Sequence, residues 1–177
     1  MDTPFAQKVV NLHPSLFVGV NCLDLRPQDV ICRLPEGVEG VWTNDQSTLD
    51  GVADVAIAIR QARETTGWDG ILFATPVTTA ESSEPGTQIG PAVAAAHIDV
   101  PTLVGYEFRQ QPVEVVQKLR QAFSGHPLGV AAAISAESVD ALLPYTNCVM
   151  TTARTDNGLE LTDSHEARRL ATKIHAS

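Results

Sequence analysis

The chain has 177 residues, which is enough to bury one sizeable hydrophobic core but short for two independent domains. Its 12 basic and 21 acidic side chains give a net charge of -9, which would repel nucleic acid and anionic lipid over most of the surface. We therefore expect a single domain over residues 1–177, with neither nucleic acid nor a membrane as its partner.

The N-terminal stretch and the cysteines favour a cytoplasmic protein. Residues 1–14 do not combine a basic start with an apolar block, as a signal peptide would, and no segment approaches the roughly 18 apolar residues of a membrane span. Cys22, Cys32 and Cys148 are odd in number and widely spaced, which is typical of reduced thiols. The five histidines lack metal-ligand spacing, so we expect no metal site and no cofactor.

Strand-like and helix-like segments alternate about six times along the chain. The strand-like runs are nearly continuous in apolar residues, which is typical of a parallel sheet covered on both faces. We predict strands over residues 16–23, 37–43, 68–76, 100–107, 127–134 and 147–153.

The intervening helices carry start and stop signals. Pro27 and Pro112 suit a first helical turn, and Ser135 suits an N-cap for a helix over residues 135–143. Asp163 or Ser164 is predicted to cap the last helix. Gly67 and Gly125 follow amphipathic stretches, where a left-handed C-cap favours glycine, and residues 78–90 are predicted to form a surface loop.

Six such units admit two parallel architectures. One is an open, doubly wound sheet, which the chain length alone favours, because a complete (βα) barrel needs eight units and roughly 250 residues. The other is a TIM-barrel-like arrangement of (βα) units that is incomplete or is completed by an oligomer. A dinucleotide-binding sheet has little support, because no GxGxxG motif follows the first predicted strand.

Four phrases in order give the chain a family resemblance: LFVGVNCLDL (16–25), LPEGVEGVWTND (34–45), SGHPLGVAAAISAESV (124–139) and LLPYTNCVMTTA (142–153). In their order and spacing they resemble the BtpA/SgcQ-like family of (βα)8 barrels. The resemblance implies that residues 16–23 correspond to the third barrel strand, so that the first two units are missing. Because removing two strands exposes sheet edges and core, we expect a homo-oligomer that closes the gap, or a rearranged open sheet.

Polar residues at the ends of the predicted strands are the candidate site, since chemistry in a parallel barrel sits at the carboxyl ends of its strands. We assign candidate catalytic roles to Asn21, Asp45 and Glu107, whose amide and carboxylates could orient a ligand and transfer protons. The candidate ligand-binding residues are Asn44, Arg109, Ser135 and Thr151.

Each candidate also has a purely structural explanation. Asn44 and Asp45 form a turn-prone pair, and Glu107 with Arg109 equally fits a surface ion pair. Asn21 is more suggestive, because a buried unpaired amide is costly, but a backbone hydrogen bond would satisfy it without a ligand.

The turn after the fifth predicted strand bears most directly on function. The family pattern implies glycines near the phosphate site of the last two strands, whereas this chain has Ala131, Ala132 and Ala133. Glycine allows close backbone approach to a phosphate and alanine largely does not. We therefore favour a non-catalytic barrel protein that acts through oligomeric or partner contacts. The alternative is an enzyme that binds a small phosphorylated or ribose-containing metabolite at the carboxyl ends of the strands.

Overall fold

A computed structural model describes residues 3–22, 24–44, 52–75, 98–105, 112–132, 134–151 and 164–176. The chain divides into two compact units, Met1–Pro101 and Thr102–Ser177. The expectation of a single domain over residues 1–177 stays a prediction. No helix among the described residues is long and apolar enough to span a membrane.

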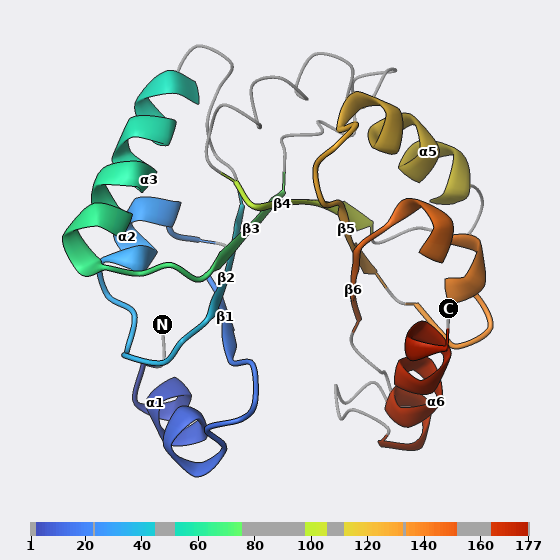
Figure 1. The fold of residues 1–177 in the computed structure, drawn as a ribbon, viewed down its shortest axis with the longest axis horizontal. Helices are drawn as coiled ribbons and strands as arrows, with labels where there is room; N and C mark the ends of the chain where they lie inside the picture. The colour runs from blue at the N-terminus through green and yellow to red at the C-terminus, as the bar shows by residue number, and fades with distance from the viewer. Residues whose placement is uncertain are drawn as a thin grey trace. The chain divides into compact units, whose positions relative to one another are not determined.

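The first unit pairs parallel strands with helices on one side. Its elements in chain order are α1 (Thr3–Leu12), β1 (Gly19–Asn21), α2 (Pro27–Ile31), β2 (Gly40–Asn44), α3 (Val52–Thr66), β3 (Ile71–Thr75) and the start of β4 (Val100–Gly105). Helices α2 and α3 contact each other and lie on the same side of β1, β2 and β3 (Figure 1). Val41 and Leu72 are in register on that covered face and are fully buried, as is Ile59 of α3.

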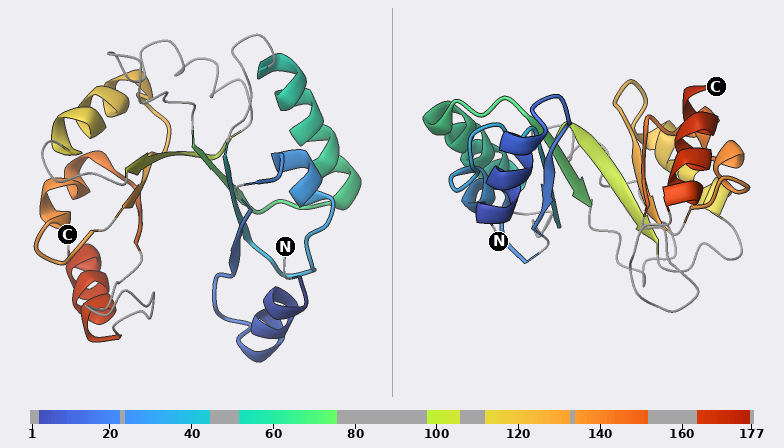
Figure 2. Two further views of the ribbon diagram at one scale, coloured as in Figure 1. Left: turned by 180° about the vertical axis from the view of Figure 1, so that it is seen from behind. Right: turned by 90° about the horizontal axis from the view of Figure 1, so that it is seen from below.

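The second unit holds the remaining elements. These are the end of β4, then α5 (Pro112–Ala122), β5 (Gly129–Ala132), the 3-10 turns η2 (Val139–Ala141) and η3 (Leu143–Tyr145), β6 (Cys148–Met150) and α6 (Ser164–His175). Figure 2 shows α5 and α6 on the same side of β5 and β6. The core contains Val116, Leu119 and Phe123 from the α5 region and Leu128 and Val130 from the β5 region.

The strand order decides between the two predicted architectures. All five neighbouring pairs are parallel, and the strands follow each other in the order β1 to β6. A doubly wound sheet would reverse its order at a switch point, whereas consecutive parallel order is that of a (βα) barrel. The TIM-barrel-like prediction with six strands is therefore confirmed, and the doubly wound alternative is wrong.

Several local signals have the predicted effect. Pro27 and Pro112 begin α2 and α5, and α6 begins at Ser164. Gly67 and Gly125 have φ angles of 69° and 88°, as expected for left-handed caps after α3 and α5.

The helix predicted over residues 135–143 is wrong, because this segment forms a turn and the two 3-10 elements η2 and η3. Serine side chains compete for the backbone of this segment, because the hydroxyls of Ser135 and Ser138 accept hydrogen bonds from backbone N–H groups of the turn. Pro144 also disfavours the α conformation of the preceding Leu143.

Candidate functional site

A hydrogen-bonded turn follows β5 in the second unit. The Ser135 hydroxyl oxygen accepts hydrogen bonds from the backbone N–H of Glu137 (3.2 Å) and of Ser138 (3.4 Å). In return, the Ser138 hydroxyl oxygen accepts a hydrogen bond from the Ser135 N–H at 3.0 Å. Ser135 therefore has the capping chemistry predicted for it, although the segment it caps is not an α-helix.

Thr151 lies beside this turn. Its hydroxyl group donates to the Ile134 carbonyl and accepts from the Ile134 N–H, both at 3.2 Å. Because Ile134 directly precedes Ser135, the structure places the two predicted residues Ser135 and Thr151 near each other, just beyond the carboxyl ends of β5 and β6. Both side chains are half-buried.

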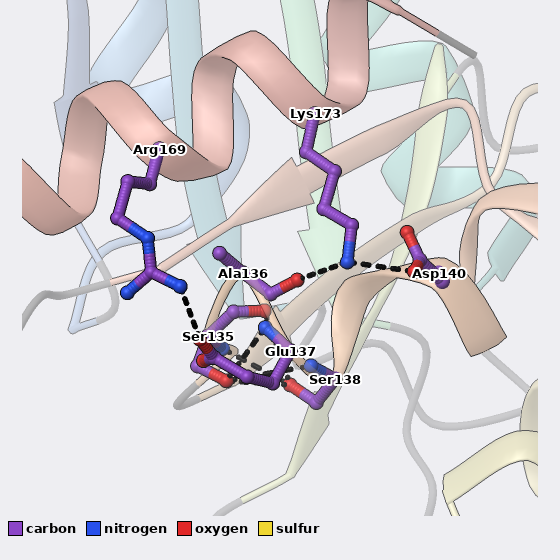
Figure 3. Close-up of polar contacts among 7 residues, drawn as sticks. All are labelled: Ser135, Ala136, Glu137, Ser138, Asp140, Arg169 and Lys173. Atoms are coloured by element: carbon purple, nitrogen blue, oxygen red, sulfur yellow. Dashed lines mark hydrogen bonds and ion pairs between the residues drawn. The ribbon is translucent and has the colours of Figure 1, made fainter.

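Helix α6 holds the turn through two cations (Figure 3). Arg169 forms an ion pair with the carboxylate of Glu137. The Lys173 ammonium donates to the Ala136 carbonyl oxygen at 2.6 Å and forms an ion pair with Asp140, also at 2.6 Å. We call residues 135–140 the Ser135 turn.

The charge of Glu137 is stabilised by its neighbours. The hydrogen bond from Arg169 lowers the pKa of the Glu137 carboxyl below its ordinary value, and hydrogen bonds from Ser135 and the backbone act in the same direction. The carboxylate is well exposed to solvent, with 64% of its side chain accessible. The carboxylate is therefore ionised at neutral pH. Because it is exposed, an anionic ligand can compete with it for Arg169.

A groove of about 650 Å³ lies between the Ser135 turn and α6. Its α6 residues recur three, four, seven and eight positions apart, which places them on one face of the helix. Three of the lining side chains are cations, one is a histidine and one is a carboxylate. The lining comprises Ala136, Glu137, His165, Arg168, Arg169, Thr172, Lys173 and Ala176.

The remaining predicted site residues lie elsewhere or outside the described chain. Asn21 is exposed at the end of β1 in the first unit and is in register with Trp42. Asn44 is the last residue of β2, and only its backbone is described. Asp45, Glu107 and Arg109 lie outside the described residues. In the described part of the chain, no three His, Cys, Asp or Glu side chains gather as metal ligands.

The sequence prediction did not include the cations of α6. The sequence does contain a pattern that indicates them. His165, Arg169 and Lys173 are spaced by four residues and therefore share one helix face. The partners of Arg169 and Lys173 lie 32 and 33 positions away along the chain, so the spacing alone does not identify them.

Comparison with solved structures shows the same fold. The chain resembles 3-hexulose-6-phosphate synthase from Salmonella typhimurium with a TM-score of 0.73 and 11% identity, covering 99% of this chain and 85% of that one. It resembles 3-keto-L-gulonate-6-phosphate decarboxylase from Vibrio cholerae with a TM-score of 0.62 and 12% identity, covering 98% and 79%. For phosphoribosyl anthranilate isomerase from Thermus thermophilus the TM-score is 0.64 at 13% identity, covering 97% and 78%.

The TM-scores support the TIM-barrel-like fold, and at identities of 11–13% the likeness is one of fold alone. No protein-family model matches the chain, and no curated protein matches it either.

Proposed function

We propose that the protein is a BtpA/SgcQ-like barrel protein that binds a small phosphorylated or ribose-containing metabolite in the groove beside the Ser135 turn. One observation carries the ligand class: an acidic chain of net charge -9 places Arg168, Arg169 and Lys173 around one groove. The groove adjoins the turn that follows β5, at the end of the strand where ligands bind in barrels. The order of the four sequence phrases supports the family.

The ion pairs of Arg169 and Lys173 with Glu137 and Asp140 are exposed to solvent, so a phosphate can compete with the two carboxylates. Glu137 and Asp140 are 64% and 60% exposed, and exposed ion pairs contribute little to stability because water screens them. A phosphate monoester carries up to two negative charges and matches the planar fork of an arginine. It can therefore replace a single carboxylate as the partner of Arg169 at small cost, while also attracting Arg168.

The other predicted polar residues are proposed separately from the groove, because Asn21 and Asn44 belong to the first unit and Asp45, Glu107 and Arg109 lie outside the described residues. Asn21, Asp45 and Glu107 are proposed as groups that orient a substrate and transfer protons, and Asn44 and Arg109 as ligand-binding residues. Ser135 and Thr151 are proposed to contact the ligand of the groove. The support for these roles is their position at strand ends in the sequence, and for Asn21 the exposed end of β1.

A thermal-shift titration tests the ligand class. Ribose 5-phosphate and inorganic phosphate should raise the unfolding temperature, whereas ribose should not, because the attraction lies in the phosphate charge. A ligand at one hundred times its dissociation constant stabilises the folded state by about 2.7 kcal/mol. No shift with either phosphate compound would rule out the proposed ligand class.

A second candidate is the non-catalytic barrel that acts through oligomeric or partner contacts. One observation favours it: several large apolar side chains near β1 are exposed. The alanines do not, because Ala131 and Ala132 lie in β5 itself and not in the turn after it, where a phosphate cradle would have glycines. The same titration separates the candidates, because an interaction protein without a ligand site gains no stability from phosphate compounds.

A further inference from the structure

Strand β1 has an open edge. The Val18 carbonyl accepts a hydrogen bond from the Gly40 N–H at 3.2 Å, and the Cys22 N–H donates to the Trp42 carbonyl at 2.8 Å. Alternate residues of the strand therefore face β2, and Gly19 and Asn21 direct their N–H and C=O groups the other way. Among the described residues, β1 pairs with β2 and with no other strand. Such an edge can accept a further strand.

Apolar side chains surround this edge. A hollow of about 410 Å³ runs along it, and it is lined by Phe5, Ala6, Val9, Leu16, Phe17, Val18, Gly19, Val20 and Asn21. Residues of both sheet faces contribute, which places the hollow along the edge rather than on one face. Phe5, Leu12, Leu16 and Phe17 are between 50% and 64% exposed, and outside this region only Ile57 and Ile71 are comparable among the described residues.

The charge of this surface favours a second copy of the chain as the occupant. Residues 3–22 contain no acidic side chain and one lysine, although the chain as a whole has a net charge of -9. Two copies therefore repel each other less at this surface than over the rest of the chain. The three exposed side chains that line the hollow, Phe5, Leu16 and Phe17, offer roughly 340 Å² of apolar surface per copy, taking about 200 Å² for each. This area is below the roughly 800 Å² per partner of a standard interface, so we expect a weak dimer in which the β1 backbone hydrogen bonds contribute much of the specificity.

We propose that two copies associate through antiparallel pairing of their β1 strands about a two-fold axis at Val20. Gly19 then lies opposite the partner's Asn21, and each of these two residues donates a backbone hydrogen bond to the other. By symmetry, Asn21 pairs in the same way with the partner's Gly19. Val20 faces its counterpart in the pair without hydrogen bonds. Phe5, Leu16 and Phe17 of each copy cover the hollow of the other. This interface does not depend on the proposed phosphate groove, and it assigns the exposed end of β1 to strand pairing and not to the chemistry proposed for Asn21.

The oligomeric mass tests the interface. Sedimentation equilibrium of the wild-type chain should give a dimer, and Leu16→Glu should shift the dissociation constant at least tenfold toward monomer, because it places a charge on each apolar face. Ile57→Glu is the matched control, since Ile57 is 42% exposed on α3, away from β1. An unchanged unfolding temperature for Leu16→Glu shows that it still folds. A monomeric wild-type chain, or equal dissociation constants for the two variants, would overturn the interface.

Covalent capture tests the register. Residues opposite each other in a pair without hydrogen bonds have Cα atoms about 4.5 Å apart, which is within disulfide reach. Val20→Cys should therefore form a covalent dimer under mild oxidation, whereas the wild-type chain, with Cys32 exposed, serves as the control for unrelated cross-linking. A Val20→Cys variant that cross-links no more than the wild-type chain contradicts pairing about Val20.

Discussion

The guanidinium carbon of Arg63 lies 4.8 Å from the centroid of the Trp68 ring. The same guanidinium donates to the Gly70 carbonyl at 3.0 Å and to the Asp99 carboxylate at 2.5 Å. The Asp99 oxygen that it contacts also accepts a hydrogen bond from the Leu72 N–H at 2.7 Å. One side chain of α3 thus ties together the residues that precede β3 and β4, and in this way it supports the register of these strands.

Replacing Arg63 should lower the stability of the protein. We expect Arg63→Ala to reduce the free energy of unfolding by about 2–3 kcal/mol, because it removes hydrogen bonds of a charged group and a cation–π contact. Arg63→Lys should lose less, since it keeps the charge but not the planar fork. Urea unfolding measures both, with the exposed Arg60→Ala as control. Equal losses for Arg60→Ala and Arg63→Ala would contradict the structural role.

Gly70 should not tolerate a side chain. A Cβ atom at this position would lie 2.4 Å from the Glu39 carbonyl oxygen and 2.6 Å from the Trp68 ring. Gly70→Ala should therefore destabilise the protein by about 1–3 kcal/mol, as overpacking typically does. At Gly19 the nearest atom is 3.5 Å away, so Gly19→Ala should change the stability by less than about 1 kcal/mol. Thermal unfolding of the two variants compares them directly, and similar midpoints would refute the expected clash.

The ion pair between Glu137 and Arg169 should make the free energy of unfolding depend on pH in the acidic range. The pKa of Glu137 is lowered in the folded state, so its contribution is fully present above the unfolded value of about 4.3 and is lost as the pH falls through the folded pKa. Glu137→Gln should therefore be less stable than wild type at pH 7, and the difference should shrink on acidification below about pH 5. The exposed Glu64→Gln is the control, and a constant difference for Glu137→Gln across this range would contradict the pairing.

The three thiols should differ in reactivity. Cys32 is exposed, whereas burial raises the pKa of both the Cys22 and the Cys148 thiols and so reduces the reactive thiolate. We expect one thiol to react rapidly with an aromatic disulfide reagent at pH 8, and all three to react in denaturant. Cys32→Ser should abolish the rapid phase; if a rapid phase persists, the assigned burial is wrong.

The sequence predicted the strands better than it predicted the site. Near-continuous apolar runs indicate parallel strands, and Gly67 and Gly125 mark helix ends because their backbone conformations favour glycine. The helix predicted after Ser135 is wrong, because serine hydroxyls bond to the backbone of the turn and Pro144 disfavours the α conformation of Leu143.

The site cations could not be placed from the sequence, because their partners depend on how α6 packs. Arg169 and Lys173 contact a turn more than 30 positions away, and no local pattern encodes that contact. The polar strand ends were easier to identify, because Asn21 interrupts the apolar run 16–23, and the structure ends β1 at Asn21. The roles of Asn21, Asp45 and Glu107 stay predictions.

Calorimetric titration with ribose 5-phosphate tests the proposed phosphate groove most directly. The wild-type chain should bind this ligand, and combined Arg168→Gln and Arg169→Gln substitutions should weaken binding at least tenfold, because each hydrogen bond from a charged group contributes about 1.5–3 kcal/mol. Arg60→Gln, at an exposed position of α3, should leave the dissociation constant unchanged. Absence of binding to the wild-type chain, or equal affinities for the double variant and the Arg60→Gln control, would contradict the proposed site.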